Sequence, residues 1–157
     1  MKNFTKIFLS IFYIGYIKFA SGTWGSIAAI IIFFLLFKKL FLSLEVLISI
    51  YIILFFISNF LINYFSSFTN SYDSKHIVID ELLGVFTIFF FYDYIFLFND
   101  LVTLLLLLII FRFFDIIKLF PANFIDKNIK SGYGVILDDI IAGLYTIITL
   151  VTLNAFI

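Results

Sequence analysis

The chain has 157 residues, of which 64% are hydrophobic and only 13% charged, and its mean hydropathy is +1.23. An average soluble domain is about half apolar and about a quarter charged, so a chain this small could not bury its apolar side chains in one core. We therefore expect it to reside in a lipid bilayer. The net charge is zero, which gives no electrostatic basis for binding nucleic acid, and the absence of cysteine excludes disulfides and thiolate chemistry.

Apolar runs alternate with short polar segments and no linker divides them, so residues 1–157 are expected to form a single membrane-embedded domain. Residues 1–20 predict a short amphipathic helix on the membrane surface, although a removable signal peptide is an alternative. Five later runs approach the length that a helix needs to cross a bilayer. They lie at about residues 26–42, 44–63, 82–98, 101–118 and 139–157.

Charged residues interrupt two of these runs, at Lys38–Lys39 and at Asp93, so either could be re-entrant or interfacial. The prediction is an all-α, polytopic helical bundle with four to five transmembrane helices. Its N-terminal helix lies at the interface.

The lysine and arginine positions predict the orientation of the chain. With five crossings and a cytoplasmic N-terminus, most of the ten cationic residues fall on the cytoplasmic side, as the positive-inside rule requires. Those inside are Lys2, Lys6, Lys18, Lys75, Arg112, Lys118, Lys127 and Lys130, and those outside are Lys38 and Lys39. The same topology brings polar segments 22–26, 73–81 and 112–139 to one membrane face, which predicts a site there.

The segment VIDELLG places Asp80 and Glu81 at the start of an apolar helix. Negative charge is favourable at the positive end of a helix dipole, so capping and solubility would account for this pair, as would a functional site. Gly84 would let another helix or a substrate phosphate approach closely.

The segment FRFFDIIKLFP carries Arg112, Asp115 and Lys118 at intervals of three, which places them on one helix face. One interpretation is structural, with Asp115 held between two cations whose long side chains reach the headgroups. The other is functional, because ionisable residues in a membrane segment usually mark a substrate or ion path. An arginine that grips phosphate beside a carboxylate that binds a metal suits anionic lipids.

The segment GYGVILDDIIAG supplies a second acidic pair, Asp138 and Asp139, at the expected entry of the last helix, after glycines that permit a tight turn or a close backbone approach. With the residues above, five carboxylates could share one site, and such oxygen ligands suit Mg²⁺ rather than Zn²⁺. The expected metal ligands are Glu81, Asp115 and Asp139.

The segment ASGTWGSIAA opens a helix with Thr23 and Ser26 next to glycines, which would offer hydroxyls and backbone N–H groups to an anion. Both residues are also ordinary N-caps. His76 is a minor candidate, because a lone histidine more often has a surface or supporting role.

Other phosphate chemistries lack their residues in this sequence. A phosphocysteine route needs cysteine, a two-histidine route needs more than His76, and neither an Asp-x-Asp pair nor a phosphate-binding GxxxxGK[ST] loop is present. The remaining mechanism uses a metal ion that is held by carboxylates and polarises the phosphoryl group. Arg112 and Lys118 would bind the non-bridging oxygens.

The chain resembles the phosphatidylglycerophosphatase A family in the order and spacing of its motifs. The matching segments are GTWGS at 22–26, IDELLG at 79–84, FRFFDIIK with Pro121, and FIDKNIKSGYGVILDDIIAG at 124–143. Two positions differ from the usual family pattern: Ser21 stands where proline is common, and Leu119 replaces the first proline after the lysine.

The resemblance implies a Mg²⁺-dependent phosphatase of the bacterial cytoplasmic membrane that converts phosphatidylglycerophosphate to phosphatidylglycerol, with its active site facing the cytoplasm. It carries over the catalytic carboxylates and the substrate-binding cations. The expected catalytic residues are Asp80, Glu81, Asp115, Asp138 and Asp139, and the expected substrate-binding residues are Thr23, Ser26, Arg112 and Lys118. The alternative function is a small transporter or ion-path subunit that uses the same charges. The expected partners of the phosphatase are phosphatidylglycerophosphate and membrane lipids. A homodimer is compatible with so small a chain, although no motif predicts one.

Overall fold

The computed structural model describes residues 2–69, 71–72 and 74–156, apart from the side chains of residues 38, 39 and 68, and every regular element in these ranges is helical. The elements are α1 (Lys2–Leu9), the 3-10 turn η1 (Ile14–Tyr16), α2 (Ser21–Phe34), the π-helical turn η2 (Leu35–Lys39), α3 (Leu44–Thr69), α4 (Ile79–Phe89), α5 (Tyr92–Ile95), α6 (Asp100–Ile117), α7 (Ala122–Asn128) and α8 (Gly132–Phe156). The prediction of an all-α fold is confirmed.

Two of the predicted membrane runs correspond to single long helices. Residues Leu44–Ser67 of α3 and Gly132–Phe156 of α8 are long and apolar enough to cross a bilayer. The run at 101–118 corresponds to α6, which carries Asp100, Arg112 and Asp115 and is therefore more polar. The number of crossings, four to five, stays a prediction.

Three predicted segments differ from the structure. The run at 82–98 is not one helix, because α4 ends at Phe89 and only the short α5 follows. The run at 26–42 begins earlier, at Ser21, and ends in the π-helical turn η2. Within residues 1–20 the α-helix stops at Leu9, since residues 11–13 have φ angles of 47–69°, outside the right-handed helical region.

Helix α8 is the centre of the bundle and packs against α3, α4, α5, α6 and α7. It approaches α4 closely where Gly143 faces Gly84. A Cβ atom on Gly143 would lie 2.6 Å from the Gly84 carbonyl oxygen, and a Cβ on Gly84 would lie 2.8 Å from the Asp139 carbonyl oxygen. Only glycine permits this backbone contact, which brings the first turn of α4 beside the second turn of α8.

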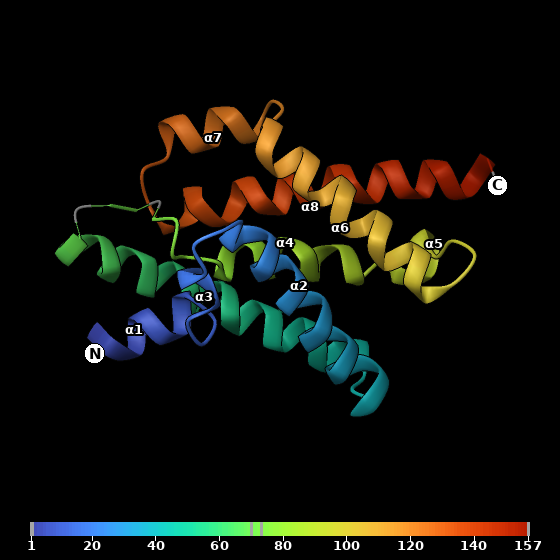
Figure 1. The fold of residues 1–157 in the computed structure, drawn as a ribbon, viewed down its shortest axis with the longest axis horizontal. Coiled ribbons are helices and arrows are strands. Elements are labelled where there is room, and N and C mark those ends of the chain that lie inside the picture. Colours follow the sequence, from blue (N-terminus) through green and yellow to red (C-terminus); the bar gives the residue numbers. More distant parts are fainter. Residues whose placement is uncertain (1, 70, 73, 157) are drawn as a thin grey trace.

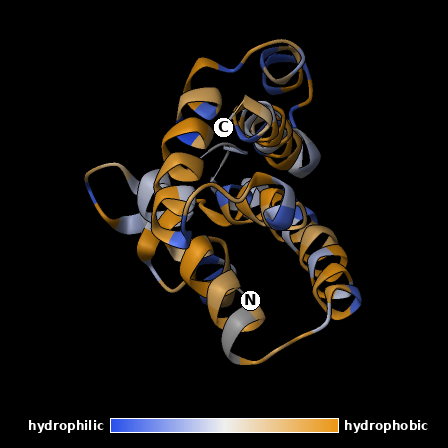
Figure 2. Cartoon of the chain, turned by 90° about the vertical axis from the view of Figure 1, so that its right-hand side faces the viewer, coloured by the Kyte–Doolittle hydropathy of each residue, from blue (hydrophilic) through white to orange (hydrophobic). Residues whose placement is uncertain are grey.

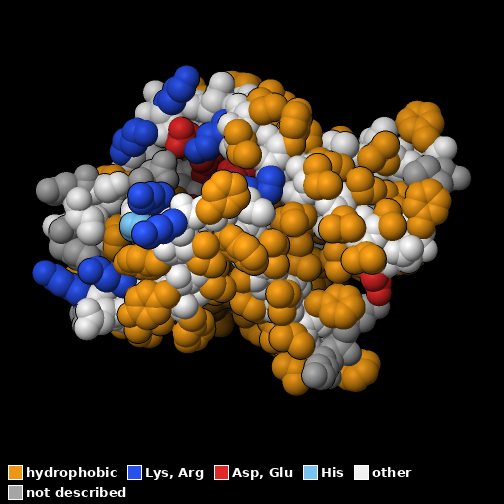
Figure 3. Space-filling view, in the orientation of Figure 1, with side chains coloured by type: hydrophobic (Ala, Val, Ile, Leu, Met, Phe, Trp, Pro, Cys, Tyr) orange, Lys and Arg blue, Asp and Glu red, His pale blue; other side chains and the backbone are white. Residues whose placement is uncertain are grey.

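The polar segments of the chain gather at one end of the bundle. Figure 1 shows α1, α7 and the N-terminal ends of α2, α4 and α8 on the left, whereas η2, α5 and the C-terminus lie at the other end. In Figure 3 the Lys and Arg side chains cluster at this same left-hand end, around a hollow that contains acidic side chains. The predicted convergence of three polar segments is therefore observed.

The remaining surface is largely apolar. Figure 2 shows hydrophobic residues along most of the helices, on outward as well as inward turns. Helix α3 carries exposed apolar side chains; Ile53, Phe56 and Phe60, for example, are 57–61% exposed. A helix that is apolar all round belongs in a hydrocarbon environment, which fits the bilayer setting.

The contact between Gly84 and Gly143 yields a stability prediction. Replacing Gly143 by alanine should lower the free energy of unfolding by about 1–3 kcal/mol through overpacking, although alanine is the better helix former. Thermal unfolding followed by circular dichroism in detergent measures the change. The exposed Ala155→Leu variant in the same helix is the control and should unfold like the parent. A Gly143→Ala protein as stable as the parent would contradict the proposed close crossing.

Candidate active site

A cavity of about 180 Å³, here called the acidic cavity, opens at the polar end of the bundle. All five predicted carboxylates line it, together with the predicted cations Arg112 and Lys118. Its lining residues are Ser21, Gly22, Ser74, Lys75, Ile77, Asp80, Glu81, Arg112, Asp115, Lys118, Asp126, Val135, Asp138 and Asp139. Residues far apart in the sequence thus meet in one place.

The two acidic pairs come from neighbouring helices. Asp80 and Glu81 lie in the first turn of α4, as predicted. Asp138 and Asp139 were predicted at the entry of the last helix, but α8 begins earlier, at Gly132, so this pair lies in its second turn. Burial rather than the helix dipole dominates the environment of this pair, because the two residues are only 5% and 4% exposed.

The glycines before this pair do not form a tight turn. Gly132 and Gly134 are helical and have negative φ angles. They serve the other predicted purpose, close approach: Gly132 lies against the backbone of Asn59, and its N–H donates to Asn63 Oδ1 at 2.8 Å.

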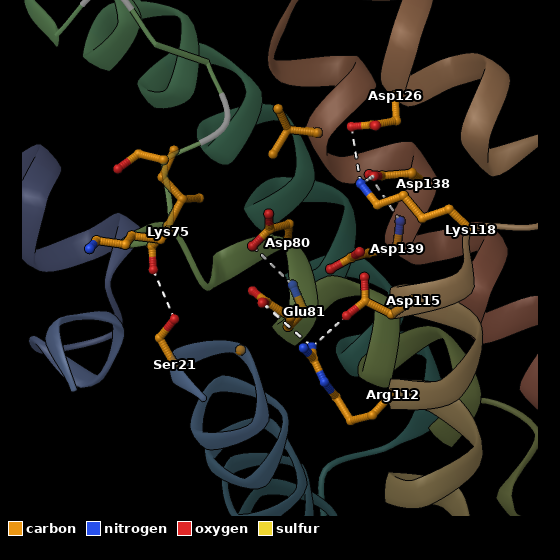
Figure 4. Close-up of a pocket in the computed structure, with 14 residues that line it drawn as sticks. Ser21, Lys75, Asp80, Glu81, Arg112, Asp115, Lys118, Asp126, Asp138 and Asp139 are labelled. Carbon is orange, nitrogen blue, oxygen red and sulfur yellow. Dashed lines mark hydrogen bonds and ion pairs between the residues drawn. The ribbon is translucent and has the colours of Figure 1, made fainter. Parts of the chain in front are cut away.

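Three of the carboxylates form a compact group. Asp80, Glu81 and Asp139 each offer an oxygen, and these oxygens all lie within 4.8 Å of one another. Figure 4 shows the three side chains converging from α4 and α8. This spacing suits a hard divalent cation bound by carboxylates. The predicted ligand set contained Asp115 in place of Asp80.

The electrostatics of the group favour a cation. Burial raises the pKa of the Glu81 carboxyl well above its ordinary value, and the negative charges of Asp80 and Asp115 raise it further. Within the described part of the chain, Glu81 Oε2 and Asp139 Oδ2 are buried without a hydrogen-bond partner. Buried oxygens of this kind are expected to have a ligand, and a divalent cation would supply it while stabilising the ionised carboxylates.

The Arg112 guanidinium lies beside this group and is held by Asp115. Arg112 Nη1 is 2.5 Å from Asp115 Oδ2, one helical turn away on α6, and 3.6 Å from Glu81 Oε1. The ion pair between Arg112 and Asp115 is therefore real, as the structural interpretation of the stripe required. It also orients the guanidinium toward the three carboxylates, which is the position needed to bind a phosphate oxygen there.

Lys118 does not share Asp115 with Arg112. It ends α6 with a φ of 49°, and its Nζ donates to Asp138 Oδ2 at 2.6 Å and pairs with Asp126 Oδ1 at 3.0 Å. Two carboxylates from α7 and α8 thus hold the Lys118 ammonium. Lys118 therefore remains a cation and neutralises buried Asp138.

The glycine-rich start of α2 contributes backbone rather than hydroxyl groups to the cavity. Gly22 lines it, and a Cβ there would overlap Glu81 and the Arg112 guanidinium. Ser26 is fully buried and its hydroxyl donates to the Gly22 carbonyl at 2.9 Å, while Thr23 is half-buried and does not line the cavity. Substrate binding by Thr23 and Ser26 stays a prediction.

Several lining residues had not been predicted. Asp126 lies on α7, where a short amphipathic segment gave no sign that its acid turns inward, and Lys75 lies in a polar loop. Ser21, at the position where proline is common in the family pattern, donates its hydroxyl to the Lys75 carbonyl at 2.9 Å. These residues line the cavity only because their segments pack beside it in the fold, which no local sequence pattern indicates.

His76 and Asp93, two polar residues singled out in the sequence, do not line the acidic cavity. The His76 ring stacks on Tyr16 with centroids 4.3 Å apart, and its Nδ1 lies 3.1 Å from the Gly15 carbonyl oxygen. This is the supporting role expected of a lone histidine. Asp93 is exposed in α5, at the opposite end of the bundle from the cavity.

Comparisons with known proteins match the chain to one family. The family model described as phosphatidylglycerophosphatase A matches residues 7–154. Among curated proteins, the chain is 29% identical over 134 residues to phosphatidylglycerophosphatase A of Haemophilus influenzae, an alignment that covers 85% of this chain and 78% of that protein. No solved structure matches the chain.

The contact between Lys118 and Asp138 can be tested by stability. Lys118→Met removes the cation but keeps a similar stem, so it leaves a buried carboxylate unpaired and should cost about 1–3 kcal/mol of unfolding free energy. Adding Asp138→Asn should restore part of this loss. Chemical unfolding in detergent gives both values, with exposed Lys127→Met as the control. If the double variant were no more stable than Lys118→Met, the pair would not be coupled.

Proposed function

The chain belongs to the phosphatidylglycerophosphatase A family, and from this we propose that it is a Mg²⁺-dependent enzyme that hydrolyses the terminal phosphomonoester of phosphatidylglycerophosphate. The products are phosphatidylglycerol and inorganic phosphate. The proposal rests above all on one feature, the three clustered carboxylates of Asp80, Glu81 and Asp139 beside the Arg112 guanidinium.

Charge balance supports the requirement for a metal. Six carboxylates line the acidic cavity and are faced by the cations Arg112 and Lys118, whereas the Lys75 side chain is directed away from Asp80 and Glu81. With these groups ionised, the excess of negative charge would repel a phosphate dianion. A divalent cation held by these carboxylates would reduce that repulsion, so we expect binding of the lipid, as well as its hydrolysis, to depend on the metal.

Different side chains have different roles in the proposed reaction. Asp80, Glu81 and Asp139 would hold Mg²⁺, which would polarise the phosphoryl group and lower the pKa of a bound water. Arg112 binds the non-bridging oxygens and stabilises the charge that shifts onto them in the transition state. Asp115 positions Arg112 through their ion pair, a role we favour over the predicted metal ligation, because its Oδ2 is paired with Arg112 and the compact carboxylate group does not include it.

Lys118 and Asp138 complete the cavity. Asp138 faces the cavity from α8 with its charge balanced by Lys118, which leaves the ammonium close enough to the site to attract phosphate as well. Asp126 shares the same ammonium from α7 and so closes that side of the cavity.

We place the enzyme in the bacterial cytoplasmic membrane as a multi-pass protein with this cavity toward the cytoplasm. The clustering of Lys and Arg at the polar end supports that orientation. The gathering of charge at one end also supports an interfacial enzyme over the alternative transporter or ion-path subunit, whose charges would be spread across the depth of the membrane.

The metal requirement gives the first functional test. Purified protein in detergent should release inorganic phosphate from phosphatidylglycerophosphate with Mg²⁺, should stop in EDTA, and should recover when Mg²⁺ is restored. Release that continues unchanged in EDTA would rule out the metal-dependent reaction.

The carboxylate cluster gives the second test. Glu81→Gln should lower kcat/KM by about 100-fold or more, because a neutral amide is a poor ligand for Mg²⁺. In EDTA the same variant should be at least as stable as the parent, since it removes repulsion among buried carboxylates. Thermal unfolding and phosphate release measure the two effects. Exposed Asp93→Asn is the matched control and should change neither. A Glu81→Gln enzyme with full activity would exclude Glu81 as a ligand.

Arg112 gives the third test. Arg112→Ala should reduce turnover by about 100-fold or more while the protein still inserts into membranes, and Arg112→Lys should recover only part of the activity, because lysine lacks the bidentate fork. Wild-type turnover by Arg112→Ala would show that the stripe on α6 is purely structural.

A further inference from the structure

A second and larger cavity, here called the cationic cavity, adjoins the acidic cavity. Its volume is about 530 Å³, and the two cavities share Ser21, Gly22, Lys75 and Arg112. The rest of its lining comes from the turn at residues 15–20 and from His76. The two cavities therefore meet at Gly22 and Arg112, so one side chain, Arg112, faces both of them.

The two cavities have opposite charge. Three cationic side chains, Lys18, Lys75 and Arg112, line the cationic cavity, and none of its described lining residues is acidic. Figure 4 shows the Lys75 side chain directed away from Asp80 and Glu81, so its ammonium belongs to the cationic side. Such a cavity favours an anion that needs no metal, bound by lysine and arginine alone.

The walls of the cationic cavity are fixed by specific contacts. His76 stacks on Tyr16 and contacts the Gly15 carbonyl, which fastens the turn to the loop before α4. The Ser21 hydroxyl donates to the Lys75 carbonyl and fastens the start of α2 to the same loop. These contacts position Lys18 and Lys75 on facing segments rather than leaving them on independent surface loops.

The rim of the cationic cavity is apolar. Tyr16 and Ile17 line it and are 39% and 41% exposed, and neighbouring Phe19 is 84% exposed. Aromatic and aliphatic side chains next to cationic groups are typical of a membrane interface. The cavity thus offers cations on one side and a lipid-compatible edge on the other.

We infer that the cationic cavity binds the phosphodiester of the lipid substrate while the terminal phosphomonoester occupies the acidic cavity. This inference rests on the proposed function. Phosphatidylglycerophosphate carries both phosphates, joined by a glycerol, and the diester also bears the diacylglycerol that must remain in the bilayer. Arg112 lies between the cavities, and Lys18 and Lys75 recognise the second phosphate. These two lysines therefore select lipids with two phosphates over lipids with a single phosphomonoester.

The experiment compares two lipids with the same acyl chains in the same detergent micelles, phosphatidylglycerophosphate and phosphatidic acid, which lacks the diester. In the Lys18→Gln/Lys75→Gln double variant, the KM for phosphatidylglycerophosphate should rise by about tenfold or more with kcat nearly unchanged. The kcat/KM for phosphatidic acid should stay at the parent value. The backbone carbonyl of residue 75, which Ser21 contacts, is retained by this substitution.

A binding measurement covers the case in which phosphatidic acid is not hydrolysed at all. Calorimetric titration with short-chain phosphatidylglycerol, which has the diester but no monoester, should show about tenfold weaker binding to the double variant. Lys127→Gln is the matched control, because it removes a cation from α7 at the same end of the bundle but lines neither cavity. Its KM and its affinity should equal those of the parent.

The outcomes separate the two proposals. If the parent protein releases no phosphate from phosphatidylglycerophosphate, the proposed function fails. If the parent is active but the double variant keeps its KM and its affinity for phosphatidylglycerol, or loses activity equally on both lipids, the diester site is overturned and the proposed function stands. If Lys127→Gln changed the KM and the affinity as much as the double variant does, general electrostatic attraction would explain the change. That result would also overturn the diester site.

Discussion

Carboxylates resist being buried close together, because each loses hydration and repels its neighbours. This protein nevertheless collects six of them in one cavity at the end of an apolar bundle. The surrounding structure offsets that cost in three ways. Lys118 pairs with Asp138 and Asp126, Arg112 pairs with Asp115, and the proposed Mg²⁺ site accounts for Asp80, Glu81 and Asp139. Asp115, Asp126 and Asp138 thus have cationic side chains as partners, and the proposed Mg²⁺ would be the partner of the other three carboxylates.

Close contact between helices makes this collection geometrically feasible. Gly84 and Gly143 allow α4 and α8 to touch through their backbones, and the acidic pairs lie within one or two turns of that contact. Carboxylates are short side chains, so helices separated by larger residues could not bring their oxygens together. The glycines therefore determine the geometry of the site although neither carries any chemistry.

The adjoining cavities match the amphiphilic nature of a lipid substrate. Negative charge is concentrated where a metal is proposed, positive charge where a phosphodiester is proposed, and apolar side chains lie at the outer rim. Arg112 is common to both cavities and is oriented by Asp115. This arrangement would let one arginine contact both ends of the same headgroup, so that reaction and recognition are linked through a single side chain.

The class of the protein and most of the chemical groups of its site could be predicted from the amino-acid sequence alone. Hydropathy predicted an apolar all-helical chain, and the unusual cost of ionisable residues in apolar segments singled out Asp80, Glu81, Arg112, Asp115, Lys118, Asp138 and Asp139. All seven line one cavity, because residues that are costly in isolation are retained where they interact.

The pairing of these groups could not be predicted from the sequence, because it depends on the packing of the helices. The tertiary structure assigned Lys118 to Asp138 and Asp126 rather than to Asp115, brought Asp80 into the compact carboxylate group, and added Lys75 and Ser21 to the cavity. The run at 82–98, expected to be one helix, is divided between α4 and α5, and α8 begins at Gly132 rather than near residue 139. Spacing along one helix defines which side chains share a face, but their partners depend on how closely and at what rotation neighbouring helices pack.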